Sequence, residues 1–117
     1  MSQERQRKPD ILQGTLDLMV LKTLAAMGPM HGYGLARRIE QLSDDAMQVS
    51  QGTIYLCLVR LVQKGWIHAE WGTSENNRKA KFYSISKAGG KQLVAETQNW
   101  ERVAGIIGRL LQLGTRG

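Results

Sequence analysis

The chain has 117 residues and a mass of 13.1 kDa, which is the size of one ordinary domain. Hydrophobic residues make up 42% of it and charged residues 22%, so a wholly disordered chain is excluded. The sequence has no apolar run near the roughly 18 residues of a membrane span, and residues 1–10 lack the apolar stretch of a signal peptide. We therefore expect a cytoplasmic protein that contacts no membrane.

The positive charge is concentrated in one stretch. Lys and Arg number sixteen against ten Asp and Glu, a net charge of +6. Residues 71–91 carry five basic residues and one acidic residue, so most of the excess lies there. A local basic patch is typical of a protein that binds a polyanion, although a face that serves only solubility has the same composition. Residues 1–10, with a net charge of +1, predict a flexible basic arm.

Two helices are predicted in the first part of the chain. Residues 15–27 are apolar nearly all round, which indicates a buried helix that Thr15 caps and a Gly-Pro pair ends. A second, amphipathic helix of about ten residues is predicted from Tyr33 to Leu42, and both of these residues are assigned to its apolar face.

A third helix is predicted from Ser50, its N-cap, to about Lys64, with Gly65 as its stop. A helical wheel assigns to its outward face Gly52, Leu56, Val59, Arg60 and Gln63. Two short helices joined by a turn, the second with a polar start, form a helix-turn-helix pattern.

The apolar period then changes to two, which is typical of strands. Residues 67–71 and 81–85 alternate between apolar and polar, and the residues at 72–79 favour turns. The pattern predicts a β-hairpin with a basic tip. The fold class is therefore mainly α with a small β-hairpin, in the winged helix-turn-helix layout.

The last predicted helix begins after Ser86 and runs to about Leu113. Its length of about 40 Å is more than the rest of the domain can cover. Apolar residues form a heptad seam along it, which favours a second copy of the chain as partner. The expected dimer interface comprises Leu93, Trp100, Val103, Ala104, Ile107, Leu110 and Leu111. In the alternative interpretation, the chain is a helical adaptor that docks another protein through this helix, and its basic hairpin is incidental.

Several stretches carry a family resemblance, namely LQGTLDL at 12–18, HGYG at 31–34, ARRI at 36–39, GTIY at 52–55, LVQKGW at 61–66 and GTSENNR at 72–78. In this order and spacing they resemble the PadR family of bacterial transcriptional regulators. The resemblance implies a dimeric DNA-binding repressor, often released from DNA by a small ligand, that works at the bacterial nucleoid. The expected domains are the arm at 1–10, a winged helix-turn-helix DNA-binding domain at 11–86 and a dimerisation helix at 87–113, as in the short-tailed branch of the family.

The sequence departs from the family at four positions. Leu56 stands where proline is usual, Val59 where a polar residue is usual, and Val62 where an acidic residue is usual; Gly90 replaces a basic residue. Leu56 and Val59 are expected on the outward face of the third helix. There they either contact thymine methyl groups in an A/T-rich site or pack against another surface.

The expected DNA contacts come from the start of the third helix and from the hairpin. Amide, hydroxyl and basic side chains there reach base edges or phosphates. The expected residues are Ser50, Gln51, Gly52, Thr53, Tyr55, Lys64, Asn76, Asn77, Arg78, Lys79 and Lys81. The plainer interpretation is that Ser50 only caps its helix, Tyr55 only packs, and the hairpin tip is a solvated turn.

A flat hydrophobic effector pocket is the second candidate site. The resemblance implies induction by a small aromatic molecule, and Trp66, Trp71 and Trp100 are suited to stack on one. Core and interface packing explains the same residues more simply.

No other chemistry is expected. His31 is assigned to capping or orienting the second helix, and no residue pairs with it as a nucleophile. A single cysteine, Cys57, excludes a multi-cysteine metal site. We therefore expect no cofactor, no metal and no enzymatic activity.

Overall fold

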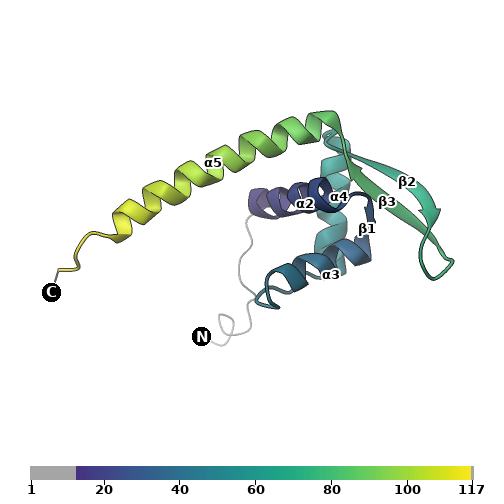
Figure 1. Ribbon diagram of the computed structural model, residues 1–117, viewed down its shortest axis with the longest axis horizontal. Helices are drawn as coiled ribbons and strands as arrows, with labels where there is room; N and C mark the ends of the chain where they lie inside the picture. Colours follow the sequence, from purple (N-terminus) through teal and green to yellow (C-terminus); the bar gives the residue numbers. More distant parts are fainter. Residues whose placement is uncertain (1–12, 117) are drawn as a thin grey trace.

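The computed structural model describes residues 13–116, so the predicted arm at 1–10 lies outside the described residues (Figure 1). The described fold is mostly helical with a small sheet, which confirms the predicted fold class. Its elements in chain order are helix α2 (Gln13–Met27), strand β1 (Met30–His31), helix α3 (Gly32–Leu42), helix α4 (Gln51–Gln63), strand β2 (Ile67–Thr73), strand β3 (Lys79–Ile85) and helix α5 (Lys87–Leu111).

One core lies where α2, α3 and α4 meet. Each of these helices buries an apolar stripe, because burial of apolar surface is the main force that holds short helices together. The side chains that are almost completely buried are Val20, Leu21, Leu24, Leu35, Ile54, Cys57, Leu58, Leu61 and Ile67. The core thus holds α4 firmly while leaving its other face free.

The ends of the helices follow the predicted signals with one exception. His31 has extended backbone, and its Nδ1 accepts a hydrogen bond of 3.0 Å from the amide of Gly34, which confirms its capping role. Ser50 caps α4 in the same way, and Gly65, with φ of +76°, follows the end of that helix. The expected cap at Thr15 is wrong, because α2 begins at Gln13 and Thr15 is already helical.

The apolar face predicted for α3 is only partly buried. Leu35, Ala36 and Ile39 lie in the core, as the helical period predicts. Tyr33 and Leu42, at the two ends, are 61% and 66% exposed. The prediction was wrong for these two residues because the neighbouring elements cover only the middle of the helix.

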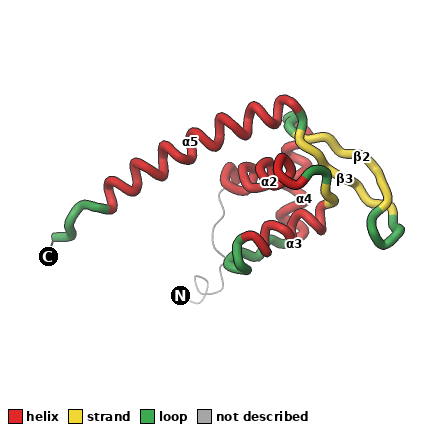
Figure 2. Tube along the Cα trace, viewed as in Figure 1, coloured by secondary structure: helices red, strands yellow, loops and turns green. Residues whose placement is uncertain are grey.

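The hairpin exists and is longer than predicted. Strands β2 and β3 pair in register from Ile67 with Ile85 to Thr73 with Lys79, so the turn is confined to 74–78. Strand β1 adds a third antiparallel strand on the other side of β3. The sequence pattern did not reveal β1, since two residues are too few to show alternation. Figure 2 shows the strands gathered at one side of the helices.

Helix α5 starts beside the sheet, crosses α2 and continues beyond the rest of the domain (Figure 1). Ser86 caps it as predicted: its side chain accepts a hydrogen bond from the amide of Gly89 and donates one to the carbonyl of Gly65. The helix ends at Leu111, so Leu113 lies beyond it rather than at its end. No helix within residues 13–116 is long and apolar enough to cross a membrane.

Candidate nucleic-acid interface

The start of α4 presents a polar face to solvent. Gln51, Gly52 and Thr53 are exposed, while Ile54 in the same turn is buried. Ser50 is engaged twice with Thr53: its hydroxyl accepts from the Thr53 amide at 3.1 Å and donates to the Thr53 hydroxyl at 2.8 Å. Ser50 is therefore occupied by capping. The side-chain amide of Gln51 is exposed at the same end of the helix and is able to reach a base edge.

The middle of the outward face of α4 is apolar. Leu56 is 64% exposed, and Val59 is half-buried. Tyr55, which is 60% exposed, lies next to Leu56 in the sequence. The family departure at Leu56 thus places an exposed aliphatic side chain on the helix whose start carries the predicted contacts to base edges.

The hairpin turn directs its charged residues outward. The amide of Ser74 donates to the carbonyl of Arg78 at 2.7 Å, and the amide of Asn77 donates to the carbonyl of Ser74 at 2.9 Å. Asn77 has φ of +58°, a conformation that asparagine tolerates better than most residues. The side chains at 76–79 are all exposed, so the basic tip is free to meet a partner.

A hollow of about 270 Å³ joins α4 to the sheet. Gln51 and Tyr55 line it from α4, Lys81 and Tyr83 line it from β3, and Tyr33 lines it from α3. The structure therefore brings together the predicted contacts of the third helix and one basic residue of the hairpin. It also adds Tyr33, which the helical period predicts on the apolar face of α3.

The two lysines predicted as phosphate contacts lie in different places. The ammonium group of Lys81 is 5.6 Å from the centre of the Trp71 ring on the hairpin. Lys64 lies at the other end of α4 from Gln51, and its ammonium group is 4.7 Å from the centre of the Trp66 ring. Lys64 is thus separated by the length of the helix from the contacts predicted at the start of α4.

A buried polar cluster, missed from the sequence, joins α2 to α4. Oδ1 of Asp17 accepts two hydrogen bonds, one of 2.6 Å from Nη2 of Arg60 and one of 3.1 Å from Sγ of Cys57. Burial, together with the hydrogen bond to Asp17, raises the pKa of the Cys57 thiol to about 12. Arg60 had been assigned to the outward face, and the structure corrects this: its side chain is only 26% exposed. The sequence signal for this ion pair is an acidic residue within the apolar first helix, Asp17, and an arginine on another helix, Arg60. That signal is too weak to predict the pair by itself.

The residues predicted for the dimer interface lie along α5. Leu93 is half-buried against the core, whereas Trp100, Ile107 and Leu110 are each exposed for about half of their area or more. The same stretch of α5 carries the remaining predicted residues: Val103 and Leu111 are exposed, and Ala104 is half-buried. One copy of the chain therefore leaves most of this seam uncovered.

The three tryptophans of the predicted effector pocket lie on separate segments. Trp66 lines a cavity of about 180 Å³ together with Asp17 and Glu96. Trp71 on β2 is 66% exposed, and Trp100 on α5 is 55% exposed. Trp66 is thus half-buried just after α4, whereas the rings of Trp71 and Trp100 are open to solvent on two other elements of one chain. Residues 13–116 hold no cluster of three or more His, Cys, Asp or Glu side chains suited to a metal.

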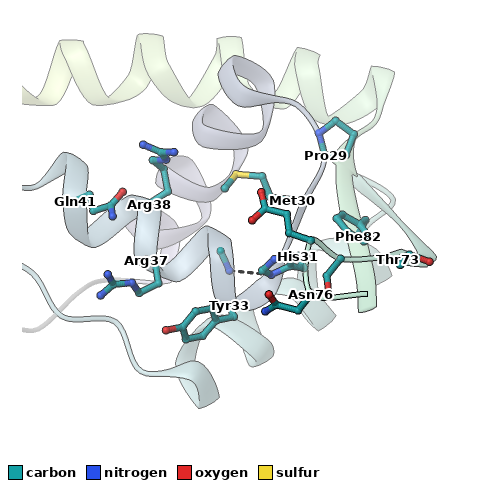
Figure 3. Close-up of a pocket in the computed structure, with 13 residues that line it drawn as sticks. Pro29, Met30, His31, Tyr33, Arg37, Arg38, Gln41, Thr73, Asn76 and Phe82 are labelled. Carbon is teal, nitrogen blue, oxygen red and sulfur yellow. Dashed lines mark hydrogen bonds between the residues drawn. The ribbon is translucent and has the colours of Figure 1, made fainter. Parts of the chain in front are cut away.

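A hollow of about 520 Å³ lies between α3 and the hairpin (Figure 3). Tyr33, Arg37 and Arg38 line it from α3, and residues 73–76 line it from the hairpin. None of these α3 residues was predicted as a functional residue. The hairpin of β2 and β3 is the wing of the predicted winged helix-turn-helix layout. The basic groups of α3 lie beside this wing only in the folded chain, so the sequence did not reveal them.

Comparisons with known proteins agree with this arrangement. A family model described as the transcriptional regulator PadR-like family matches residues 20–95. An uncharacterized protein X from Lysinibacillus sphaericus is 28% identical over 100 residues, which cover 86% of this chain and 91% of that protein.

Solved structures of PadR-like regulators have the same fold. One from Bacillus cereus is 28% identical with a TM-score of 0.76, covering 88% of this chain and 97% of that chain. A PadR family regulator from Eggerthella lenta is 26% identical with a TM-score of 0.72, covering 87% and 86%. Proteins of this family are DNA-binding transcriptional regulators and not enzymes. The chain therefore belongs to the PadR-like family of transcriptional regulators.

Proposed function

We propose that this regulator is a sequence-specific repressor that binds double-stranded DNA as a homodimer and releases it when a small, aromatic ligand binds. The observation that supports DNA contact most directly is the shared face of α4 and the hairpin. The exposed start of α4 and Lys81 of β3 line one hollow, and the exposed tip at 76–79 extends beside it. A helix of this kind reads base edges in the major groove, and basic side chains on the wing neutralise phosphates.

A salt titration tests the DNA-binding part of the proposal. The probe is a 30-bp duplex from upstream of the protein's own gene, with a scrambled duplex as its control. Arg78→Ala should weaken binding to both duplexes. It should also lower the salt slope, which is the steepness with which log K falls against log [salt], by about 0.9, because one phosphate contact is lost. Gln51→Ala should reduce the preference for the upstream duplex. Equal loss on both duplexes would contradict a base-reading role for Gln51.

The same titration addresses the adaptor alternative. Phosphate neutralisation makes affinity fall steeply with salt, whereas an apolar docking surface is insensitive to it. If the wild-type chain binds both duplexes weakly and without salt dependence, the adaptor interpretation gains and the repressor proposal fails.

The homodimer is supported by the uncovered seam of α5. Ile106, Ile107 and Leu110 remain exposed on a helix that extends beyond its own domain. Such apolar surface is unfavourable in water unless another surface covers it, and a second copy of the same helix provides a matching seam.

Ile107→Asp tests the dimer. The variant would bury an unpaired charge at the seam, at a cost of several kcal/mol, and should sediment as a monomer. Gln112→Asp, which adds the same charge outside the seam, should remain dimeric. A dimeric Ile107→Asp at micromolar concentration would show that α5 is not the main interface.

The ligand-responsive part is supported by apolar space beside the seam. A groove of about 500 Å³ lies between α2 and the first half of α5, with Leu18, Met19, Leu93 and Val94 among its lining residues. Trp100 follows on the same helix. A ligand that binds here would contact both the dimer helix and the domain that carries α4. Release of DNA needs a ligand that prefers the DNA-incompetent dimer, and a 100-fold preference corresponds to about 2.7 kcal/mol of coupling.

A further inference from the structure

Helix α3 carries an exposed polar strip beside the predicted DNA contacts. Tyr33 lies at its first turn and Arg37 one turn later, and both are exposed. Figure 3 shows Tyr33 and Arg37 projecting from the same part of α3, with Arg38 turned away from them, although all three residues line the hollow beside the hairpin. Neither Tyr33 nor Arg37 has a role in the core.

Tyr33 stands between two hollows. It lines the larger one with the turn of the hairpin, and it lines the smaller one with Gln51 of α4 and Lys81 of β3. The tyrosine ring therefore forms the ridge between the start of α4 and the wing.

The start of α3 is held rigidly in this position. His31 caps the helix through Nδ1 and pairs with Phe82 of β3 in the sheet. The two rings also meet edge to face, with centres 5.6 Å apart and planes at 75°. The placement of Tyr33 relative to the wing is thus fixed before any partner binds, which lowers the entropic cost of a contact.

The charges around the strip favour an anion. Arg37 and Arg38 lie one after the other on α3, and Lys81 lies across the smaller hollow from Tyr33. One acidic residue, Glu75 on the hairpin turn, also lines the larger hollow, and Glu40 lies further along α3. The carboxylate of Glu40 accepts a hydrogen bond of 3.0 Å from the amide of Val49, so it serves the connection between α3 and α4.

We propose that Tyr33 and Arg37 bind the phosphate backbone of one DNA strand, as a contact separate from α4 and the wing tip. The inference rests on the proposed DNA-binding face. A recognition helix in the major groove and a wing at the adjacent minor groove have one sugar-phosphate strand between them. That strand must pass over whatever lies between α4 and the wing, and here that is the Tyr33 ridge.

The chemistry of the two side chains suits this partner. A tyrosine hydroxyl donates one hydrogen bond to a phosphate oxygen, and an arginine guanidinium donates two in parallel. Such contacts set the register and the angle of the protein on DNA without reading sequence. Tyr33 and Arg37 are therefore positioning residues for the base contacts of α4.

The test uses the full chain and a 30-bp duplex of mixed sequence, so that no operator is needed. Arg37→Gln should weaken binding about tenfold, the typical loss for a hydrogen bond to a charged group, and lower the salt slope by about 0.9. Tyr33→Phe removes only a hydroxyl and should weaken binding about fivefold with the slope unchanged. Arg102→Gln removes the same charge from an exposed arginine on α5, away from the proposed DNA contacts, and as the matched control it should keep the wild-type slope. The melting temperatures of all three variants should equal that of the wild type.

Two results would overturn the inference while leaving the proposed function intact. One is a wild-type slope and affinity for both Arg37→Gln and Tyr33→Phe. The other is an equal loss for Arg37→Gln and Arg102→Gln, which would indicate a general effect of net charge. If the wild-type chain itself shows no salt-dependent binding to DNA, the proposed function fails together with this inference.

Discussion

Replacing Asp17 with asparagine should destabilise the domain by removing the charge that holds α4 on α2. The Asp17 side chain is 10% exposed and that of Arg60 is 26% exposed, with 2.6 Å between Oδ1 and Nη2. At this distance, and with an effective dielectric constant of about 20, the attraction is roughly 6 kcal/mol before the cost of desolvation. Breaking a fully buried pair on one side costs about 3–5 kcal/mol, because the remaining charge loses its partner.

The expected loss for Asp17→Asn is lower, at about 2–3 kcal/mol. Water reaches a quarter of the Arg60 side chain, and the asparagine oxygen still accepts a hydrogen bond. For a domain of this size the loss corresponds to a melting temperature lower by about 10 °C. Urea unfolding followed by tryptophan fluorescence measures the free energy directly.

Two further variants make this prediction sharp. Glu75→Gln removes the same charge from an exposed carboxylate and should change stability by less than about 0.5 kcal/mol. The double variant Asp17→Asn with Arg60→Met removes both charges, so it should be more stable than Asp17→Asn alone. If Asp17→Asn behaves like Glu75→Gln, the ion pair contributes nothing to the position of α4, and the reasoning is refuted.

Three other predictions follow from single residues. Gly89→Ala should lower the melting temperature, because the new Cβ would collide with the backbone oxygen of Trp66, whereas the space around Gly90 is open and Gly90→Ala should be neutral or stabilising. The Cys57 thiol should resist alkylation until the chain unfolds. Its pKa is about 12 in the folded chain and 9.0 in the unfolded chain, so stability should be lost as pH rises from 9 toward 12, and less steeply in Cys57→Ala. Trp100→Ala should reduce the response to an inducing ligand more than the affinity for DNA; a fully responsive variant would rule out a pocket at this ring.

The local features of this protein could be predicted from the sequence because they depend on residues only a few positions apart. Ser50 and Ser86 accept hydrogen bonds from amides three residues later, so their capping is written in the local pattern. The alternation at 67–71 and 81–85 predicted the hairpin, and the heptad period predicted a long final helix. The sequence therefore predicted helix α4 and the wing as elements and gave their order in the chain, but it did not predict how they pack together.

The features that needed tertiary structure connect residues distant in the sequence or depend on what covers a surface. Asp17 and Arg60 are 43 positions apart, and neither has a local pattern that names the other. Strand β1 forms only because β3 offers an edge to two residues without a period of their own. The helical period places Tyr33 on the apolar face of its helix, but burial depends on a neighbour being present at that point. The other elements leave the first turn of α3 uncovered, and for that physical reason the side chain faces the space between α4 and the wing.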